Sequence, residues 1–170
     1  LLRAGDMNSD GRLDFMTVLN SKGLLQVYIQ QQEAAGVRTF DKREYVLSEN
    51  LVDMAVMDWN GDGREDVIVS TSDQTLGVRL QQVDGSLSDM EKIAENARYL
   101  LAEDMDGDGK VDLLSGDEGE MRIFYNPARG RNRSEPSVLY VSSSPLGRPA
   151  LADMDGNGLP DKINNNKKRK

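Results

Sequence analysis

A nine-residue pattern that occurs four times restricts the possible folds of this 170-residue chain more than any other feature. The pattern is Asp-x-Asp/Asn-x-Asp/Asn-Gly-x-x-Asp, and its copies read DMNSDGRLD, DWNGDGRED, DMDGDGKVD and DMDGNGLPD. They begin at Asp6, Asp58, Asp104 and Asp153, so successive starts are 58 − 6 = 52, 104 − 58 = 46 and 153 − 104 = 49 residues apart. This nearly constant spacing indicates a tandem array of structural units of about 50 residues each.

Each position of the pattern has a physical role in holding a cation. Acidic or amide side chains at the first, third and fifth positions converge because the chain curls, and glycine at the sixth permits a sharp turn, for which we expect φ > 0. The seventh residue offers its backbone carbonyl, so its side chain is free to vary, and the ninth Asp adds a carboxylate. The expected ligands are Asp6, Asn8, Asp10, Arg12, Asp14; Asp58, Asn60, Asp62, Arg64, Asp66; Asp104, Asp106, Asp108, Lys110, Asp112; and Asp153, Asp155, Asn157, Leu159, Asp161.

Composition and charge favour calcium as the ion. The chain has no Cys and no His, which excludes Ser-His-Asp triads, Cys-His pairs, the usual zinc sites and disulfides. The net charge is −8; it would be +5 without the thirteen carboxylates at ligand positions and 0 with four divalent ions bound. We therefore expect about four Ca²⁺ ions, and poor order in the loops without them, because the carboxylates repel each other. The alternative is that these are simple strand-joining turns, but such turns need no ninth Asp.

The flanking residues distinguish these loops from EF-hands. An EF-hand needs Glu at its twelfth position, where this chain has Thr17, Val69, Ser115 and Asn164. After the ninth Asp come FMTVL, VIVS and LLSG, which are short apolar or β-branched runs typical of strands rather than of an amphipathic helix. The segments LLRAG, LVDMAVM, ARYLLAE and PALA, which precede the loops, also have the length of strands. Each loop is therefore predicted to join two strands.

Two further strands are predicted in each of the first three units. They cover residues 27–30, 78–81 and 123–126, and then TFDKREYVLS, SDMEKIAEN and PSVLYVSS. Four short strands in a repeated unit of about 50 residues are typical of a β-propeller blade, so the predicted fold is all-β with four-stranded antiparallel blades. We expect blades at residues 1–50, 51–96 and 97–145, a partial blade at 146–165 with its first two strands, and a basic tail at 166–170.

A closed propeller needs about four to eight blades. Three and a half blades would expose unpaired strand edges and an apolar blade face at both ends. The chain is therefore expected to be part of a larger propeller, completed by the remaining blades of the same protein or by further copies of the chain.

With a calcium loop between the first and second strands of each blade, the chain resembles the FG-GAP/VCBS repeat family, whose blades also form integrin α-subunit propellers. The resemblance covers essentially the whole chain. The Phe-Gly and Gly-Ala-Pro sequences of the integrin version are not present, so the bacterial VCBS form is more similar. The resemblance implies an extracellular, cell-surface or periplasmic location and a role in adhesion, carbohydrate binding or as an accessory domain beside an enzyme.

Two classes of function remain open. The first is a calcium-stabilised binding or scaffold module, whose other loops contact a carbohydrate or protein partner. The second is part of a propeller enzyme that acts on polysaccharide or phospholipid, which would need an acid-base group with a tuned pKa. Outside the metal loops, no Asp, Glu, Tyr or Lys stands out in the sequence, so no catalytic residue is expected. Neither a membrane span nor a nucleic-acid partner is expected, because there is no run of about 18 apolar residues and no aromatic-basic surface.

Two other features each have two interpretations. Trp59, at the second position of its loop, is either a platform for a stacked ligand or a side chain packed against a neighbouring strand. The segment PARGRNRSEP, residues 127–136, is expected in a loop between the third and fourth strands of its blade. Its three arginines either contact a phosphate or glycan or are solvated.

Overall fold

The structure is a computed structural model that describes residues 1–117, 119–126, 137–141 and 150–163. The arginine-rich segment 127–136 and the basic tail 166–170 therefore lie outside the described residues. Within them the chain is all-β apart from one 3₁₀ turn, η1 (Asn20–Lys22). No helix in the described part is both long and apolar enough to span a membrane.

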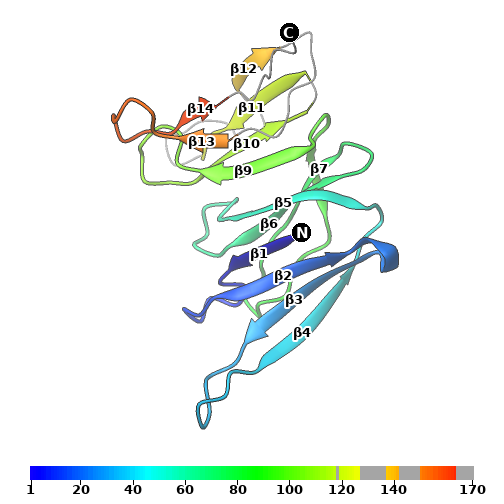
Figure 1. Cartoon of the computed structure of the whole chain (residues 1–170). Coiled ribbons are helices and arrows are strands. Elements are labelled where there is room, and N and C mark those ends of the chain that lie inside the picture. The colour runs from blue at the N-terminus through cyan, green and yellow to red at the C-terminus, as the bar shows by residue number, and fades with distance from the viewer. Residues whose placement is uncertain (118, 127–136, 142–149, 164–170) are drawn as a thin grey trace, which may run out of the picture.

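Three four-stranded antiparallel sheets follow one another along the chain, and a two-stranded sheet follows them (Figure 1). In each sheet the spatial order of the strands is the order of the sequence, which confirms the predicted all-β fold with four-stranded antiparallel blades. The sheets consist of β1 (Leu2–Gly5), β2 (Asp14–Leu19), β3 (Leu24–Gln30) and β4 (Phe40–Val46); β5 (Leu51–Met57), β6 (Asp66–Thr71), β7 (Leu76–Arg79) and β8 (Glu91–Ala94); β9 (Tyr99–Glu103), β10 (Asp112–Gly116), β11 (Glu120–Phe124) and β12 (Ser137–Val141); and β13 (Ala150–Ala152) with β14 (Asp161–Ile163).

Each copy of the motif occupies the turn between the first and second strands of a sheet. In the first sheet, β1 ends one residue before Asp6 and β2 begins at the ninth-position Asp14. The other three copies have the same placement, because β6, β10 and β14 also begin at the ninth-position Asp. We refer to residues 6–14, 58–66, 104–112 and 153–161 as loops one to four.

The middle sheet is packed on both faces, which explains the continuous apolar run in its second strand. All six residues of β6 are buried. Val67 and Val69 join a core with Met16 and Leu25 of the first sheet. Ile68 points to the opposite face, as alternation along a strand requires, and joins a second core with Leu113 of the third sheet and its neighbours.

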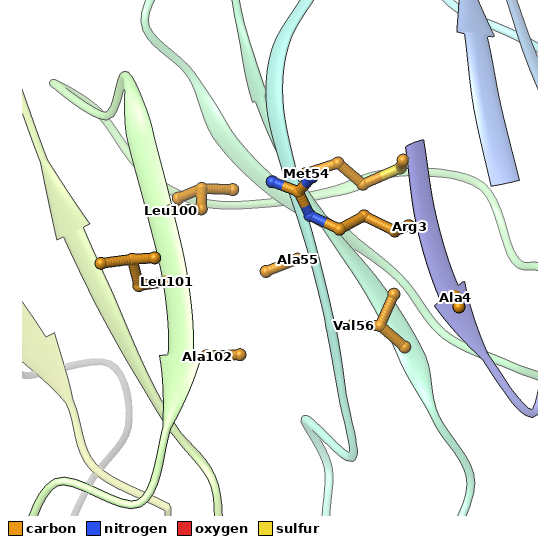
Figure 2. A pocket seen from close by; sticks show the side chains of 8 residues that line it. All are labelled: Arg3, Ala4, Met54, Ala55, Val56, Leu100, Leu101 and Ala102. Atoms are coloured by element: carbon orange, nitrogen blue, oxygen red, sulfur yellow. The ribbon is translucent and has the colours of Figure 1, made fainter. Parts of the chain in front are cut away.

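The first strands of the three sheets lie side by side at one edge of the stack, with β5 between β1 and β9 (Figure 1). Asp53 joins them: the Nη2 of Arg3 lies 2.7 Å from its Oδ1, and the backbone N–H of Leu100 donates to its Oδ2 at 3.1 Å. Beside this contact is a cavity of about 480 Å³. Figure 2 shows its lining, which is Arg3, Ala4, Met54, Ala55, Val56, Leu100, Leu101 and Ala102.

The second residues of the first two motif copies pack against the next sheet. Met7 is 1% exposed in the core between the first two sheets. The ring of Trp59 lies 6.1 Å from that of Phe124 in the third sheet, which favours the packing interpretation of this residue. Met105 packs against a third cluster, which Leu151 of β13 also contacts. Met154, at the same position of loop four, is 71% exposed.

The contrast between two methionines at the same motif position gives a test of this packing. Met7→Ala should lower the free energy of unfolding by about 2–5 kcal/mol, because it leaves a cavity between two sheets. Met154→Ala should change it by no more than about 0.5 kcal/mol, because the side chain is exposed. Urea unfolding of both variants in the same buffer measures the difference. Equal effects would contradict the packing of Met7 between the sheets.

Candidate cation-binding loops

Glycine supplies the backbone conformation that closes each loop. The sixth-position glycines have φ between 79° and 85°, in the left-handed region that other residues avoid, as predicted. The fourth position also has a positive φ in all four loops, at Ser9, Gly61, Gly107 and Gly156. The sequence interpretation missed this second turn, although glycine at three of the four places was a signal for it.

The first-position Asp draws the loop around its own carboxylate. In loop two, Asp58 Oδ1 accepts the backbone N–H groups of Gly61 at 2.8 Å and Asp62 at 3.1 Å, and Oδ2 accepts that of Gly63 at 2.9 Å. Asp104 and Asp153 accept the equivalent three N–H groups in loops three and four. These bonds curl the backbone, which turns the side chains of the third and fifth positions toward the first.

Loop three brings three of its predicted ligands together. One carboxylate oxygen from each of Asp104, Asp106 and Asp108 lies within 4.8 Å of the other two. Partial desolvation raises the pKa of Asp104, but the N–H groups of Gly109 and Gly107 outweigh it, so this pKa lies below its usual value. The carboxylate is therefore ionised at neutral pH, and the cluster concentrates negative charge at one point.

Loop one contains a buried oxygen that suits a cation. Asn8 Nδ2 donates to Asp10 Oδ2 at 2.7 Å, while Asn8 Oδ1 is buried and has no hydrogen-bond partner in the described part of the chain. A buried amide oxygen without a donor is costly, and a hard cation satisfies it as a donor would. The residues present therefore fit an oxygen-liganded ion such as Ca²⁺.

The ninth-position Asp is a clamp between the loop and the third strand. Asp66 Oδ2 accepts the N–H of Trp59 at 2.9 Å, and its Oδ1 accepts the N–H of Gln81 at 2.8 Å. Asp14 and Asp112 make the same pair of bonds in their own loops. Each carboxylate oxygen keeps a second acceptor site, so the role of these residues as ligands stays a prediction. The side chain of Asp161 lies outside the described part of loop four.

These clamps are charged groups in a buried place. Asp14, Asp66 and Asp112 are at most 1% exposed. Burial raises their pKa above the usual value, although the two backbone N–H groups work in the opposite direction. Neighbouring carboxylates of the same loop raise it further, as Asp62 does for Asp66. A cation bound in the loop would lower these pKa values, because it stabilises the ionised carboxylate.

The seventh-position arginines make specific contacts with their side chains, although the motif leaves this side chain free to vary. Arg64 forms an ion pair with the fifth-position Asp62, and its Nε donates to the backbone oxygen of Gln81 at 3.0 Å. Arg12 pairs in the same way with Asp10 and donates to the backbone oxygen of Gln30 at 3.2 Å.

Loops one and two are also connected to each other, through a buried glutamine that sequence reasoning did not identify. Gln81 is 1% exposed and lies just beyond the end of β7. Its Nε2 donates to the backbone oxygens of Asp6 at 3.0 Å and Glu65 at 3.1 Å, and Ser9 Oγ donates to its Oε1 at 2.8 Å. No local sequence signal marks this contact, because its partners lie up to 75 residues away.

When no cation is bound, the contribution of the ninth Asp to stability comes from its role as a clamp and not from its role as a ligand. Unfolding in chelator therefore measures the clamp alone. In chelator, Asp66→Ala should lower the free energy of unfolding by about 2–4 kcal/mol, because two buried N–H groups lose their acceptor, with relief of the buried charge as a partial offset. Asp62→Ala is the control, since it removes a carboxylate of the same loop that is part exposed. Its cost should be no more than about 1 kcal/mol. Equal losses in urea unfolding would show that Asp66 is no clamp.

Comparison with known proteins identifies the family. No curated protein matches the chain. The model of the FG-GAP-like repeat family matches residues 6–69 and 104–163, which together make up more than half of the chain. The two matched segments contain all four motif copies and the strand, or most of it, that follows each copy, whereas β1 and β9 lie just before the matched segments. By this match, and in agreement with its three four-stranded sheets, the chain belongs to the FG-GAP-like repeat family.

Proposed function

We propose that this chain is a calcium-binding propeller module in which Ca²⁺ ions order the four motif loops. The observation that carries the proposal is the convergence of Asp104, Asp106 and Asp108 in loop three. Three carboxylates held this close repel each other unless a cation lies between them. The same residue pattern in the other three loops, and the buried Asn8 oxygen of loop one, extend the proposal to about four ions.

The ligand set favours calcium over magnesium. Side chains at the first, third, fifth and ninth positions and a carbonyl at the seventh offer up to five protein ligands per loop. Calcium takes 6–8 oxygens in flexible geometry, whereas Mg²⁺ requires a near-ideal octahedron and usually keeps several waters. When bound, the ion would neutralise the carboxylates and fix the loop between the first two strands of its sheet.

The proposed role is that of an extracellular, cell-surface or periplasmic binding or scaffold module. Calcium sites of extracellular modules have dissociation constants of about 10⁻⁴ to 10⁻³ M, which suit a compartment with millimolar calcium. The cavity between the first strands favours binding over catalysis, because Arg3 is the one ionisable group among the described residues that line it, and the adjacent Asp53 is 2% exposed and paired with Arg3. Such a lining offers no acid and base of the kind that hydrolysis or elimination requires. The proposed partner is a carbohydrate or a protein.

We also propose that further blades cover the two outer sides of the stack, either from the same protein or from other copies of the chain. The second-position side chains of loops one and two pack against a following sheet, and Met105 of loop three packs against a cluster that Leu151 of β13 also contacts, whereas Met154 is 71% exposed. At the opposite end, Phe15 and Tyr28 stack with ring centroids 4.6 Å apart, and Phe40 meets Phe15 edge-on. The equivalents of Phe15 in the next two sheets, Val67 and Leu113, are fully buried against a preceding sheet.

Calcium binding is tested by calorimetric titration and by melting curves with calcium and with chelator. We expect about four ions, and roughly 0.4 to 1.4 kcal/mol of stabilisation per independent site at millimolar calcium. The double variant Asp104→Asn/Asp108→Asn should bind one ion fewer. Asp73→Asn, in a turn outside the motifs, should bind as many as the wild type. A melting temperature that does not respond to calcium would refute the structural role of the ion.

Whether other copies of the chain cover the outer sides of the stack is tested by size-exclusion chromatography with light scattering in calcium, which measures the mass of the particle. The 18.8 kDa chain should associate, because apolar blade faces favour contact with another blade. Met154→Asp should weaken the association, and Val83→Asp, at a side chain that is 90% exposed in the second sheet's 80–87 hairpin, should not. A compact monomer at all concentrations would contradict association between copies.

A further inference from the structure

We propose that Arg12 and Arg64 are internal counter-ions, which neutralise loops one and two when these hold no cation and lower the calcium affinity of both. Loops three and four, which lack such an arginine, then fill at lower calcium concentrations. This inference rests on the proposed calcium binding and adds an order of occupancy to it.

The position of Arg64 supports a role as a counter-ion. Its guanidinium group pairs with the carboxylate of Asp62, a predicted ligand, and the side chains of the two residues are only 29% and 25% exposed. The Nε bond to the backbone oxygen of Gln81 anchors the guanidinium group to the end of the third strand. Because the guanidinium group is planar and already anchored by this bond, its pairing with the carboxylate costs little further conformational entropy. Loop two therefore carries a fixed positive charge at one of its own ligands.

Loop one repeats the arrangement with different residues. Arg12 pairs with Asp10, and its Nε donates to the backbone oxygen of Gln30. Gln30 and Gln81 are equivalent, because the N–H of each donates to the ninth-position Asp of its loop. The same two anchors, a fifth-position Asp and the backbone oxygen of a Gln, therefore recur in both units that have arginine at the seventh position.

The seventh residues of the other two loops do not supply this charge. Lys110 is exposed, and its side chain forms no ion pair with a described residue. Leu159 is apolar and lies against Gly107 of loop three. Loops two and four each have three carboxylates and one Asn at the ligand positions, and they differ in charge at position seven, where loop two has Arg64, and at position eight, where its Glu65 accepts the N–H of Asp6 in loop one. Loop three has a fourth carboxylate in addition.

Binding of calcium to loop two requires that the ion share Asp62 with the guanidinium group or displace it. Either event opposes binding, since the two cations repel each other and an existing ion pair is weakened. The same guanidinium group reduces the repulsion among Asp58, Asp62 and Asp66 when the loop is empty. Arginine at this position therefore lowers affinity and raises the stability of the empty loop at the same time.

Trp59 makes loop two observable by itself. It is the only Trp of the chain, it lies at the second position of loop two, and its N–H donates to Asp66. Terbium is a luminescent substitute for calcium, so Tb³⁺ excited through Trp59 reports occupancy of the nearest loop. Titration with Tb³⁺, followed by displacement with Ca²⁺, then gives the affinity of loop two. The measurement is made in an Asp106→Asn/Asp108→Asn background, to exclude a signal from loop three.

Arg64→Gln should raise the affinity of loop two about three- to tenfold, because one repelling charge and one competing ion pair are removed. The calcium affinity of loop two in Arg64→Lys should lie between those of the wild type and Arg64→Gln, since lysine keeps the charge but lacks the planar guanidinium group. Arg122→Gln is the matched control, because Arg122 pairs with Glu120 outside the motifs. It should leave the titration unchanged.

A second measurement separates a counter-ion from a merely structural arginine. In chelator, Arg64→Gln should melt at a lower temperature than the wild type, and saturating calcium should remove the difference. A variant that is less stable in both conditions, with unchanged or weaker affinity, would overturn the inference. If the variants bind calcium but loop two is indifferent to residue 64, only this inference fails. If neither the wild type nor any variant binds Tb³⁺ or Ca²⁺, the proposed function fails with it.

Discussion

The buried carboxylate at the start of β2, β6 and β10 is the interaction on which the rest of each of these three units depends. Asp66 accepts one N–H from its own loop and one from the residue just after β7, so a single side chain fixes three segments of the sheet. Without it two backbone N–H groups, one in the loop and one just after the third strand, would lose their acceptor. The charge that makes the clamp strong is also costly to bury, and burial accordingly raises its pKa. A cation in the loop would offset that cost, which connects the metal chemistry to the stability of the sheet.

The stacking of the sheets depends on a second regularity, the alternation of side chains in the buried strands. In β6, Val67 and Val69 contribute to one core and Ile68 to the next, so one strand serves two interfaces. The second residues of loops one and two add to the same interfaces from the loop, as Met7 does. A motif that reads as a metal site is thus also part of the hydrophobic packing. Its polar positions face the proposed ion, and its second position faces the neighbouring sheet.

Local patterns in the sequence were sufficient to predict the strands, the position of the loops between them and the left-handed glycine at position six. They were sufficient because each depends on residues within one unit, such as the apolar run that follows Asp66. The bonds that sequence reasoning missed involve backbone groups or distant units. The N–H of Gln81 carries no sequence signal, and its side chain reaches Asp6 only because two sheets are stacked. The ion pair of Arg64 was missed for another reason: the motif is defined by the carbonyl at that position, and the pattern says nothing of the side chain.

The buried side chain of Gln81 has a consequence for how the loops become ordered. Its backbone belongs to the clamp of loop two, while its amide group holds the backbone oxygen of Asp6 at the start of loop one. Ordering loop two therefore also restricts the backbone of loop one. The conformational entropy that loop one has lost in this way is not lost again when loop one itself becomes ordered. By the reciprocity of such coupling, ordering loop one assists loop two to the same extent. We therefore expect loops one and two to become ordered together.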